Sequence, residues 1–264
     1  MELGLSGKIS IVTGGSKGIG RTTALALARE GSDVAICARG MEELEHAATK
    51  IRAQTGRKVL AVRADMGNAD DIKNLISSTV AELGGVDILI NNAVNSVAAP
   101  FMELADEDWL NHINVKVMGY VRCSREAIPH MINRGGGRII NIGGIAARNV
   151  NAITNSNGVT NSAVSNIAKN LSDQVAKDGI LVNCIHPGTT RTPRQDMILQ
   201  RQAKDASVTI EEAERRAVAG IPIGRMVEPE DIADLVLFLV SVRASAITGQ
   251  TIAVEGGAGR GIHY

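Results

Sequence analysis

Aromatic residues are scarce in this sequence, and an excess of charge is missing altogether. Phe, Trp and Tyr make up 2% of the 264 residues, so the chain offers few rings on which a planar ligand could stack. Lys plus Arg and Asp plus Glu both total 28, and the formal net charge at pH 7 is zero. Without excess positive charge no long-range field attracts nucleic acid or an anionic membrane, and neither is expected as a partner.

Cysteine and histidine are also few and scattered. The three cysteines, Cys37, Cys123 and Cys184, lie far apart in apolar stretches, which is typical of buried thiols in a reducing compartment. No Cys or His pair has the spacing of metal ligands, so no metal site is expected. The N-terminal residues lack the apolar core of a signal peptide, and no apolar run is as long as a membrane span. We therefore expect a soluble cytoplasmic protein.

Short apolar runs that suit β-strands alternate with helical segments along the whole chain. Runs that are apolar on both faces are typical of parallel strands covered by helices on each side. Strands separated by helices imply right-handed crossovers. We expect one α/β domain over residues 1–264, a doubly wound Rossmann-type fold with a seven-stranded parallel sheet. The predicted strands are Ile9–Thr13, Val34–Cys37, Val59–Arg63, Ile88–Ile90, Arg138–Ile142, Leu181–Ile185 and Thr251–Val254.

One charged segment interrupts this alternation. Arg191–Ile223 is partly helical and lies between the sixth strand and the last helix, where a lid over the substrate would be found. The other predicted helices carry apolar residues at helical spacing. They are Arg21–Glu30, Met41–Gln54, Asp70–Leu83, Trp109–Asn133, Ser156–Lys177 and Glu228–Val240.

The first predicted strand runs into a glycine-rich turn and then directly into a helix. The turn reads Thr13-Gly14-Gly15-Ser16-Lys17-Gly18-Ile19-Gly20. Its glycines permit a tight bend and let the backbone approach a pyrophosphate at the N-terminus of the helix. In this context the turn predicts a dinucleotide site, and a tight turn without a ligand is the alternative.

The second predicted strand indicates which dinucleotide is bound. NAD sites usually place an Asp or Glu at its end to hold the ribose 2′-hydroxyl. This strand ends Ile36-Cys37-Ala38-Arg39, without an acid. Arg39 and Lys17 suit a 2′-phosphate, since guanidinium pairs well with phosphate oxygens. NADP(H) is therefore predicted over NAD(H), unless Arg39 is only a solvated charge.

These features, with Asn91-Asn92-Ala93 after the fourth strand, resemble the short-chain dehydrogenase/reductase (SDR) family over essentially the whole chain. The resemblance implies an adenine contact at Asp65, a catalytic Asn at Asn114 and nicotinamide contacts after the sixth strand. It also implies a homotetramer, or else a dimer. Val94 departs from the family, which has Gly there. The cofactor-binding residues implied are Gly14, Ser16, Lys17, Gly18, Ile19, Gly20, Arg39, Asp65, Met66, Asn91, Ala93, Pro187, Gly188, Thr190 and Thr192.

The catalytic Ser, Tyr and Lys of the family are not found at their usual places. The resemblance assigns Gly144 to the Ser position, Asn157 to the Tyr position and Asn161 to the Lys position. Neutral amides donate hydrogen bonds but do not exchange protons near pH 7, and a positioned acid or base is worth roughly 10²–10⁴ in rate. We therefore expect ketone and alcohol redox by the usual family mechanism to be weak or absent.

The remaining polar residues near these positions have two interpretations. Asn157 and Asn161 share one helix face and, with Asn114, form a trio of amides. Such a trio would hold a substrate carbonyl or stabilise an enolate, or else it records drift after activity was lost. His186, at the carboxyl end of the sixth strand, is a candidate acid or base, although the family commonly has a His there. Tyr120, six residues beyond Asn114, faces elsewhere.

Basic residues near the expected pocket are equally open to two interpretations. Arg148, Arg191 and Arg194 either face the pocket and favour an anionic substrate, or are solvated charges of the lid.

Three functions are compatible with the sequence. The first is an NADP(H)-dependent oxidoreductase with a rearranged site, because the nucleotide end is intact. The second is a non-redox enzyme on the same scaffold, such as an isomerase, a dehydratase or a hydrolytic enzyme. The third is a catalytically inactive protein that binds or senses NADP(H).

Overall fold

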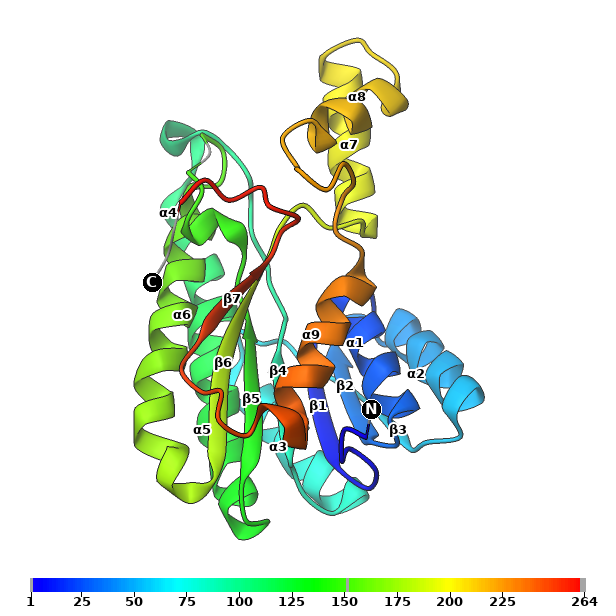
Figure 1. Cartoon of the computed structure of the whole chain (residues 1–264). Coiled ribbons are helices and arrows are strands. Elements are labelled where there is room, and N and C mark those ends of the chain that lie inside the picture. The colour runs from blue at the N-terminus through cyan, green and yellow to red at the C-terminus, as the bar shows by residue number, and fades with distance from the viewer. Residues whose placement is uncertain (1, 151, 262–264) are drawn as a thin grey trace.

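The computed structural model describes residues 2–150 and 152–261 and is built around one twisted sheet of seven parallel strands (Figure 1). The strand order, β3-β2-β1-β4-β5-β6-β7, changes direction between β1 and β4. This order confirms the predicted doubly wound Rossmann-type sheet. The strands are β1 Ile9–Thr13, β2 Asp33–Ala38, β3 Val59–Arg63, β4 Ile88–Asn91, β5 Gly137–Ile142, β6 Ile180–Pro187 and β7 Thr251–Val254, each overlapping its predicted range.

Helices cover both faces of the sheet. One face packs against α1 (Gly18–Arg29), α2 (Met41–Thr55) and α9 (Pro229–Val240). The other packs against α3 (Ala69–Leu83), α5 (Gly119–Asn133) and α6 (Asn155–Val175). Short 3₁₀ helices lie between some of these elements: η1 Phe101–Glu103, η3 Ile145–Ala147, η4 Ala176–Asp178 and η5 Val242–Ala244.

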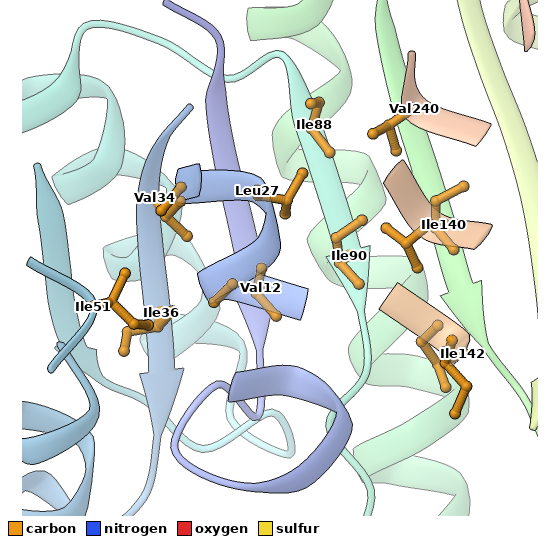
Figure 2. Packing of buried hydrophobic residues seen from close by; sticks show 14 of the residues in the cluster. Val12, Leu27, Val34, Ile36, Ile51, Ile88, Ile90, Ile140, Ile142 and Val240 are labelled. Atoms are coloured by element: carbon orange, nitrogen blue, oxygen red, sulfur yellow. The ribbon is translucent and has the colours of Figure 1, made fainter. Parts of the chain in front are cut away.

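Neighbouring residues of each central strand enter opposite cores. In β1, Ile11 belongs to the core under α3, α5 and α6, while Val12 belongs to the core under α1, α2 and α9. Val12, Ile90 and Ile140 come together with Leu27 of α1 and with α9 in Figure 2. Burying one such side chain contributes about 1.5–3 kcal/mol, which explains why both faces of these strands are apolar in the sequence.

The predicted helix Trp109–Asn133 is divided into three segments. It consists of α4 (Asp106–His112), a π-helical turn η2 (Ile113–Met118) and α5. A π-helical turn is wider than an α-helical turn and changes the direction in which the following side chains point. Hydrophobic periodicity does not reveal such a turn, because its few residues lie between two ordinary helices.

The charged insertion forms two helices beyond the carboxyl edge of the sheet. They are α7 (Pro193–Asp205) and α8 (Ile210–Val218), which project from the body of the protein in Figure 1. The side chain of Thr192 accepts a hydrogen bond from the Gln195 N–H and so begins α7. Their small core contains Leu199, Ala203, Ala213 and Met226.

The turn between β1 and α1 is packed against the end of β4. Gly14 and Gly18 have positive φ values of 68° and 51°, which favour glycine. A Cβ on Gly20 would lie 2.3 Å from the carbonyl oxygen of Gly14 and 2.5 Å from Nδ2 of Asn92. The spacing of glycines in the sequence is therefore required by the fold of this turn, whatever ligand binds there.

Replacing Gly20 with Ala is expected to lower the free energy of unfolding by about 1–3 kcal/mol, because a methyl group must be forced against backbone. Gly220→Ala is the matched control, since a Cβ at Gly220 meets nothing within 4 Å. Urea unfolding of both variants measures the difference, and equal stabilities would contradict the close approach.

Candidate active site

The carboxyl ends of β4, β5 and β6 open into a cavity of about 920 Å³, closed on one side by α7 and α8. Predicted residues of the cofactor end and of the catalytic end both line this cavity, which places the two halves of the site side by side. These residues are Ile19, Gly144, Asn157, Asn161, Pro187, Gly188, Thr190 and Thr192. The other predicted site residues lie outside its lining: Gly14, Ser16, Lys17, Gly18, Gly20, Arg39, Asp65, Met66, Asn91, Ala93, Asn114 and His186.

Hydrogen bonds join the glycine-rich turn to the end of β4. The hydroxyl of Thr13 accepts hydrogen bonds from the backbone N–H groups of Asn92 (2.9 Å) and Ala93 (3.0 Å). The side-chain amide of Asn92 donates to the carbonyl oxygens of Thr13 (2.9 Å) and Gly14 (3.3 Å). The N-terminus of α1 is thus fixed beside the cavity, and helix N-termini bind anions such as phosphates.

The two basic residues predicted to hold a 2′-phosphate differ in their surroundings. Arg39 is exposed immediately after β2, and its backbone carbonyl accepts a hydrogen bond from Arg63 Nε at 3.2 Å. Lys17 is exposed and forms an ion pair with Glu43 of α2. An exposed pair of this kind contributes little stability, so a phosphate can compete with Glu43 for Lys17.

Asp65, Met66 and Asn91 are engaged by the protein. Asp65 accepts a hydrogen bond from the Gly67 N–H at 2.8 Å and shapes the loop after β3, while Met66 of the same loop is buried in the core under α3, α5 and α6. Asn91 is fully buried, and its amide donates to Asn141 Oδ1 at 3.0 Å and to Ser124 Oγ at 3.3 Å. At the end of β4, Asn92 and Val94 line the cavity, whereas Asn91 and Ala93 do not.

The segment after β6 borders both the cofactor end and the lid. The Gly188 N–H donates to the Val254 carbonyl at 2.8 Å, and a Cβ on Gly188 would lie 2.8 Å from Cα of Glu255. The Thr190 hydroxyl donates to the Gly188 carbonyl at 2.9 Å. These contacts hold the segment as a fixed wall of the cavity, and the segment leads directly into α7.

Two of the three predicted amides face the cavity together. Asn157 and Asn161, one turn apart on α6, both line it. Asn161 is 4% exposed, and its Oδ1 has no hydrogen-bond partner among the described residues. A Cβ on Gly144 would lie 2.7 Å from Asn161 Nδ2, so the amide of Asn161 occupies the space of a side chain at position 144.

Asn114 does not join this pair, and the predicted trio of amides is not formed. Its Nδ2 donates to the Gly67 carbonyl at 3.0 Å, and its Oδ1 accepts a hydrogen bond from Arg122 Nη1 at 2.8 Å. The reason is the π-helical turn, which directs Asn114 toward the loop after β3.

The imidazole of His186 is hydrogen-bonded to the turn after β5. Its Nδ1 accepts a hydrogen bond from the Gly144 N–H at 2.9 Å, and its Nε2 lies 3.0 Å from Ser165 Oγ. Burial, together with the positive charges of Arg148 and Lys116, lowers the pKa of His186 to about 4. A neutral imidazole with both nitrogens engaged positions Gly144 and has no proton to give a substrate.

Lys116 is the residue of this site that the sequence analysis missed. It is 4% exposed, lines the cavity, and donates from Nζ to the Gly143 carbonyl at 3.1 Å. Burial is the largest cause that lowers the pKa of its ammonium group to about 8. Its position between Val115 and Val117 was a usable signal, since a Lys flanked by apolar residues of a buried helix needs a reason to be there.

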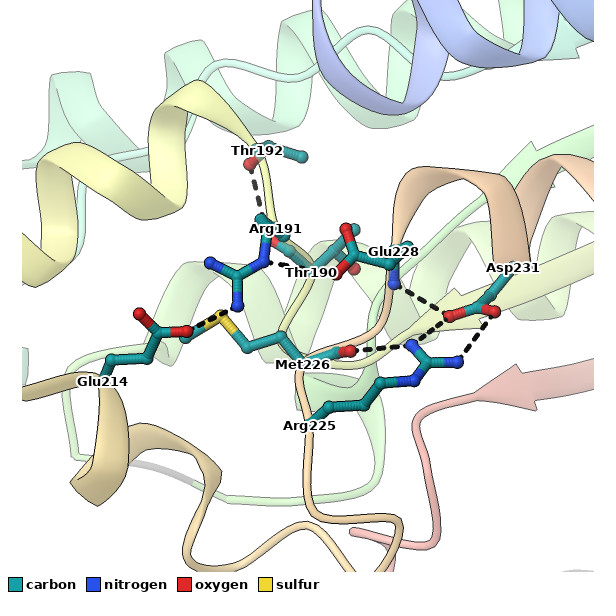
Figure 3. A network of polar contacts seen from close by, with 8 residues as sticks. All are labelled: Thr190, Arg191, Thr192, Glu214, Arg225, Met226, Glu228 and Asp231. Carbon is teal, nitrogen blue, oxygen red and sulfur yellow. Dashed lines mark hydrogen bonds and ion pairs between the residues drawn. The ribbon is translucent and has the colours of Figure 1, made fainter. Parts of the chain in front are cut away.

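The three candidate arginines have different places. Arg191 pairs with Glu214 at 2.5 Å and with Glu228 at 3.2 Å, next to the Arg225–Asp231 pair that Figure 3 also shows. This network fastens α8 and the segment before α7 to the start of α9. Arg148 donates to the Thr251 carbonyl at 3.2 Å. Arg194 lines the cavity and donates to Ser96 Oγ at 2.7 Å, joining the lid to the loop after β4.

Neither a metal site nor a membrane helix is found in the part of the chain that the structure describes. Residues 2–150 and 152–261 contain no group of three or more His, Cys, Asp or Glu side chains arranged to hold a metal ion. No helix within these ranges is long and apolar enough to cross a membrane.

Comparisons with known proteins agree with this geometry. The family model described as enoyl-(acyl carrier protein) reductase matches residues 14–259. A putative ketoacyl reductase from Streptomyces coelicolor is 32% identical over 96% of this chain and 97% of its own length. Dehydrogenase/reductase SDR family member 4 from Oryctolagus cuniculus is 31% identical over 96% of this chain and 94% of its own length.

Solved structures give the same result. The L-sorbose reductase of Gluconobacter frateurii, solved with NADPH and L-sorbose, superposes with a TM-score of 0.96 at 34% identity. The match covers 99% of this chain and 100% of that chain. Other solved relatives were determined with NADPH or with NADH, and a further one is described as an NADPH-dependent reductase. The chain therefore belongs to the short-chain dehydrogenase/reductase family of nucleotide-binding, NAD(P)-dependent oxidoreductases.

Proposed function

We propose that this protein is an NADP(H)-dependent oxidoreductase that acts on a small carbonyl or alcohol substrate in a non-standard active site. The observation that carries the proposal is the shared cavity. Ile19, next to the nucleotide turn, and Thr190, after β6, line the same space as Asn157 and Asn161. A substrate and a nicotinamide bound in this cavity would therefore lie next to each other.

The cofactor preference rests on the end of β2. No acid stands there to hold a ribose 2′-hydroxyl, and the exposed guanidinium of Arg39 follows directly after Ala38. Guanidinium binds phosphate oxygens in a bidentate manner, whereas a free 2′-hydroxyl gives it much less to bind. NADP(H) is the cofactor that these residues favour.

A nicotinamide ribose also fits the buried amide on α6. Oδ1 of Asn161 is an acceptor that lacks a hydrogen-bond partner among the described residues, and leaving such an atom unsatisfied costs about 1–3 kcal/mol. The hydroxyl groups of a ribose are donors of the required kind. Bound NADP(H) would supply a hydride donor or acceptor, and Asn161 would hold its ribose.

The non-standard character of the site lies in three positions. We assign Gly144, Asn157 and Asn161 to the places of the family's catalytic Ser, Tyr and Lys. The amides of Asn157 and Asn161 orient a carbonyl oxygen but do not protonate it. The loss of a proton donor removes roughly 10²–10⁴ in rate from the usual mechanism. A protein that binds NADP(H) without turnover is the second candidate function, and this lack of a proton donor among the three is the observation that favours it.

The lid contributes positive charge to the cavity. Arg194, Arg201 and Arg216 line it, and Asp205 is the acidic residue of the same lining. We propose that residues 191–223 cover the substrate and that the substrate carries an anionic group, which this excess of guanidinium groups would attract. A cytoplasmic homotetramer, or else a dimer, stays our expectation for the assembly.

Arg39→Ala is expected to weaken NADPH binding about tenfold or more, the effect of losing about 1.4 kcal/mol of charge-assisted hydrogen bonding, and to leave NADH binding unchanged. Calorimetric titration of both cofactors measures the dissociation constants. Arg29→Ala, at the far end of α1, is the control and is expected to bind both as the parent does. Tighter binding of NADH than of NADPH by the parent would contradict the assignment.

Gly144→Ala is expected to destabilise the protein by about 1 kcal/mol or more in the parent, because its Cβ meets the Asn161 amide. The same change in an Asn161→Ala background should cost much less, since the backbone at Gly144 is extended and accepts any residue. The double-mutant cycle, followed by urea unfolding, should give a coupling energy of about 0.5–3 kcal/mol. Additive effects would show that the two positions do not share one space.

A further inference from the structure

A carbonyl reductase needs a group that gives a proton near neutral pH, and few side chains of this cavity qualify. Among the described residues that line it, the titratable ones are Lys116, Arg194, Arg201, Asp205 and Arg216. Arginine does not release its proton in proteins. The Asp205 side chain is 67% exposed on the lid and pairs with Arg201. Lys116 is the one lining group that is both buried and able to exchange a proton.

The two buried histidines near the cavity do not take this role. His186 uses both ring nitrogens on Gly144 and Ser165. His112 is fully buried, with Nδ1 2.9 Å from Ser156 Oγ and Nε2 3.2 Å from Thr160 Oγ1. Burial lowers the pKa of both imidazoles to about 4, so both are neutral at pH 7.

The position of Lys116 follows from the π-helical turn between α4 and α5. From that turn its side chain crosses to the end of β5, where Nζ donates to the Gly143 carbonyl. The next residue, Gly144, packs against the amide of Asn161. The ammonium group therefore lies at the turn that also contacts the amide of Asn161, and one of its three protons is used in the hydrogen bond to the Gly143 carbonyl.

From this geometry we propose that the Lys116 ammonium group is the proton donor to the substrate carbonyl oxygen, in a site where the amides of Asn157 and Asn161 orient the substrate and the ribose. The inference rests on the proposed redox function and deepens it.

The reaction balances with this donor. Bound NADPH would supply a hydride to the substrate carbonyl carbon, with both electrons of the nicotinamide C–H bond. The π electrons of the carbonyl would move to its oxygen, which would form a bond to a proton from Lys116 Nζ. The electrons of that N–H bond would stay on nitrogen, so the products would be an alcohol, the oxidised cofactor and a neutral amine. The amine would then take up a proton from solvent, which restores the ammonium group.

The surroundings of Lys116 suit such a donor. Burial lowers its pKa, the charge of Arg194 on α7 lowers it further, and the thiol of Cys184 on β6 raises it. The neighbouring imidazoles of His112 on α4 and His186 on β6 are neutral and add no charge at pH 7. With a pKa of about 8, the ammonium group is mostly protonated at pH 7 and close to the pH of use, where general acids are most effective.

The first test measures Lys116 without any cofactor. In the protein with isotope-labelled lysine side chains, NMR is expected to show one Nζ that titrates near pH 8, well below the usual value of roughly 10.4. The signal should vanish in Lys116→Met and persist in Lys169→Met, whose lysine is 61% exposed on α6. Titration of Lys116 together with the exposed lysines would overturn the proposal.

The second test measures hydride transfer in a single turnover with NADPH and a panel of ketones, keto acids and ketoses. In the parent, the rate of reduction should fall as pH rises through about 8, because the ammonium group loses its proton. Lys116→Met should lose roughly 10²–10⁴ in rate while its NADPH dissociation constant stays within about threefold of the parent. Lys116→Arg should not restore the rate, since it keeps the charge without a transferable proton.

The outcomes distinguish the role of Lys116 from the redox function of the protein. Undiminished reduction by Lys116→Met overturns the role of Lys116 alone. A parent that binds NADPH and reduces none of the carbonyl compounds overturns the redox function and this inference with it. Reduction that Lys116→Met loses and Lys169→Met keeps supports both.

Discussion

The turn at Gly143 and Gly144 has no room for side chains, and the active site is arranged around that constraint. A Cβ on Gly143 would lie 2.4 Å from His186 Nδ1, and one on Gly144 would lie 2.7 Å from Asn161 Nδ2. The carbonyl of Gly143 accepts the ammonium group of Lys116, and the N–H of Gly144 donates to His186. Side chains from η2, α6 and β6 thus contact one short stretch of backbone. A residue larger than Gly at position 143 or 144 would displace these side chains.

The electrostatics of the site follow from burial. Burial lowers the pKa of the His112 and His186 imidazoles to about 4 and raises the pKa of the Cys184 thiol. These three groups, which lie around Lys116, are therefore uncharged at pH 7. The charges that face the cavity come from Lys116 and from the lid, and they are positive apart from Asp205. Burying the Lys116 ammonium group in such surroundings lowers the stability of the fold, so its presence indicates a functional role.

Sequence patterns predicted the parts of the molecule that depend on local rules. Apolar runs such as Ile9–Thr13 gave all seven strands, because a strand buried on both faces has a distinctive composition. The glycine-rich turn was also predicted from local sequence, because the backbone itself needs Gly14 and Gly20 at these positions.

The positions of three side chains at the site could not be predicted, because their directions depend on tertiary structure. The π-helical turn points Asn114 toward Gly67 and Arg122 and brings Lys116 to the end of β5, and helical periodicity does not show such a turn. The partners of His186 lie on β5 and α6, far apart in sequence, so its occupied nitrogens could not be foreseen. The helical insertion was located from its charge, but which of its arginines would reach the cavity was set by packing between α7 and the loop at Ser96.

We propose that this SDR scaffold transfers a hydride with Gly144, Asn157 and Asn161 in its site. The most direct measurement uses NADPH carrying two deuterium atoms at C4 of its nicotinamide, with mass spectrometry of the alcohol formed from each carbonyl compound. The expected product is an alcohol that carries one deuterium on the former carbonyl carbon. A protein that binds NADPH tightly and forms no deuterated alcohol from any ketone, keto acid or ketose would contradict it.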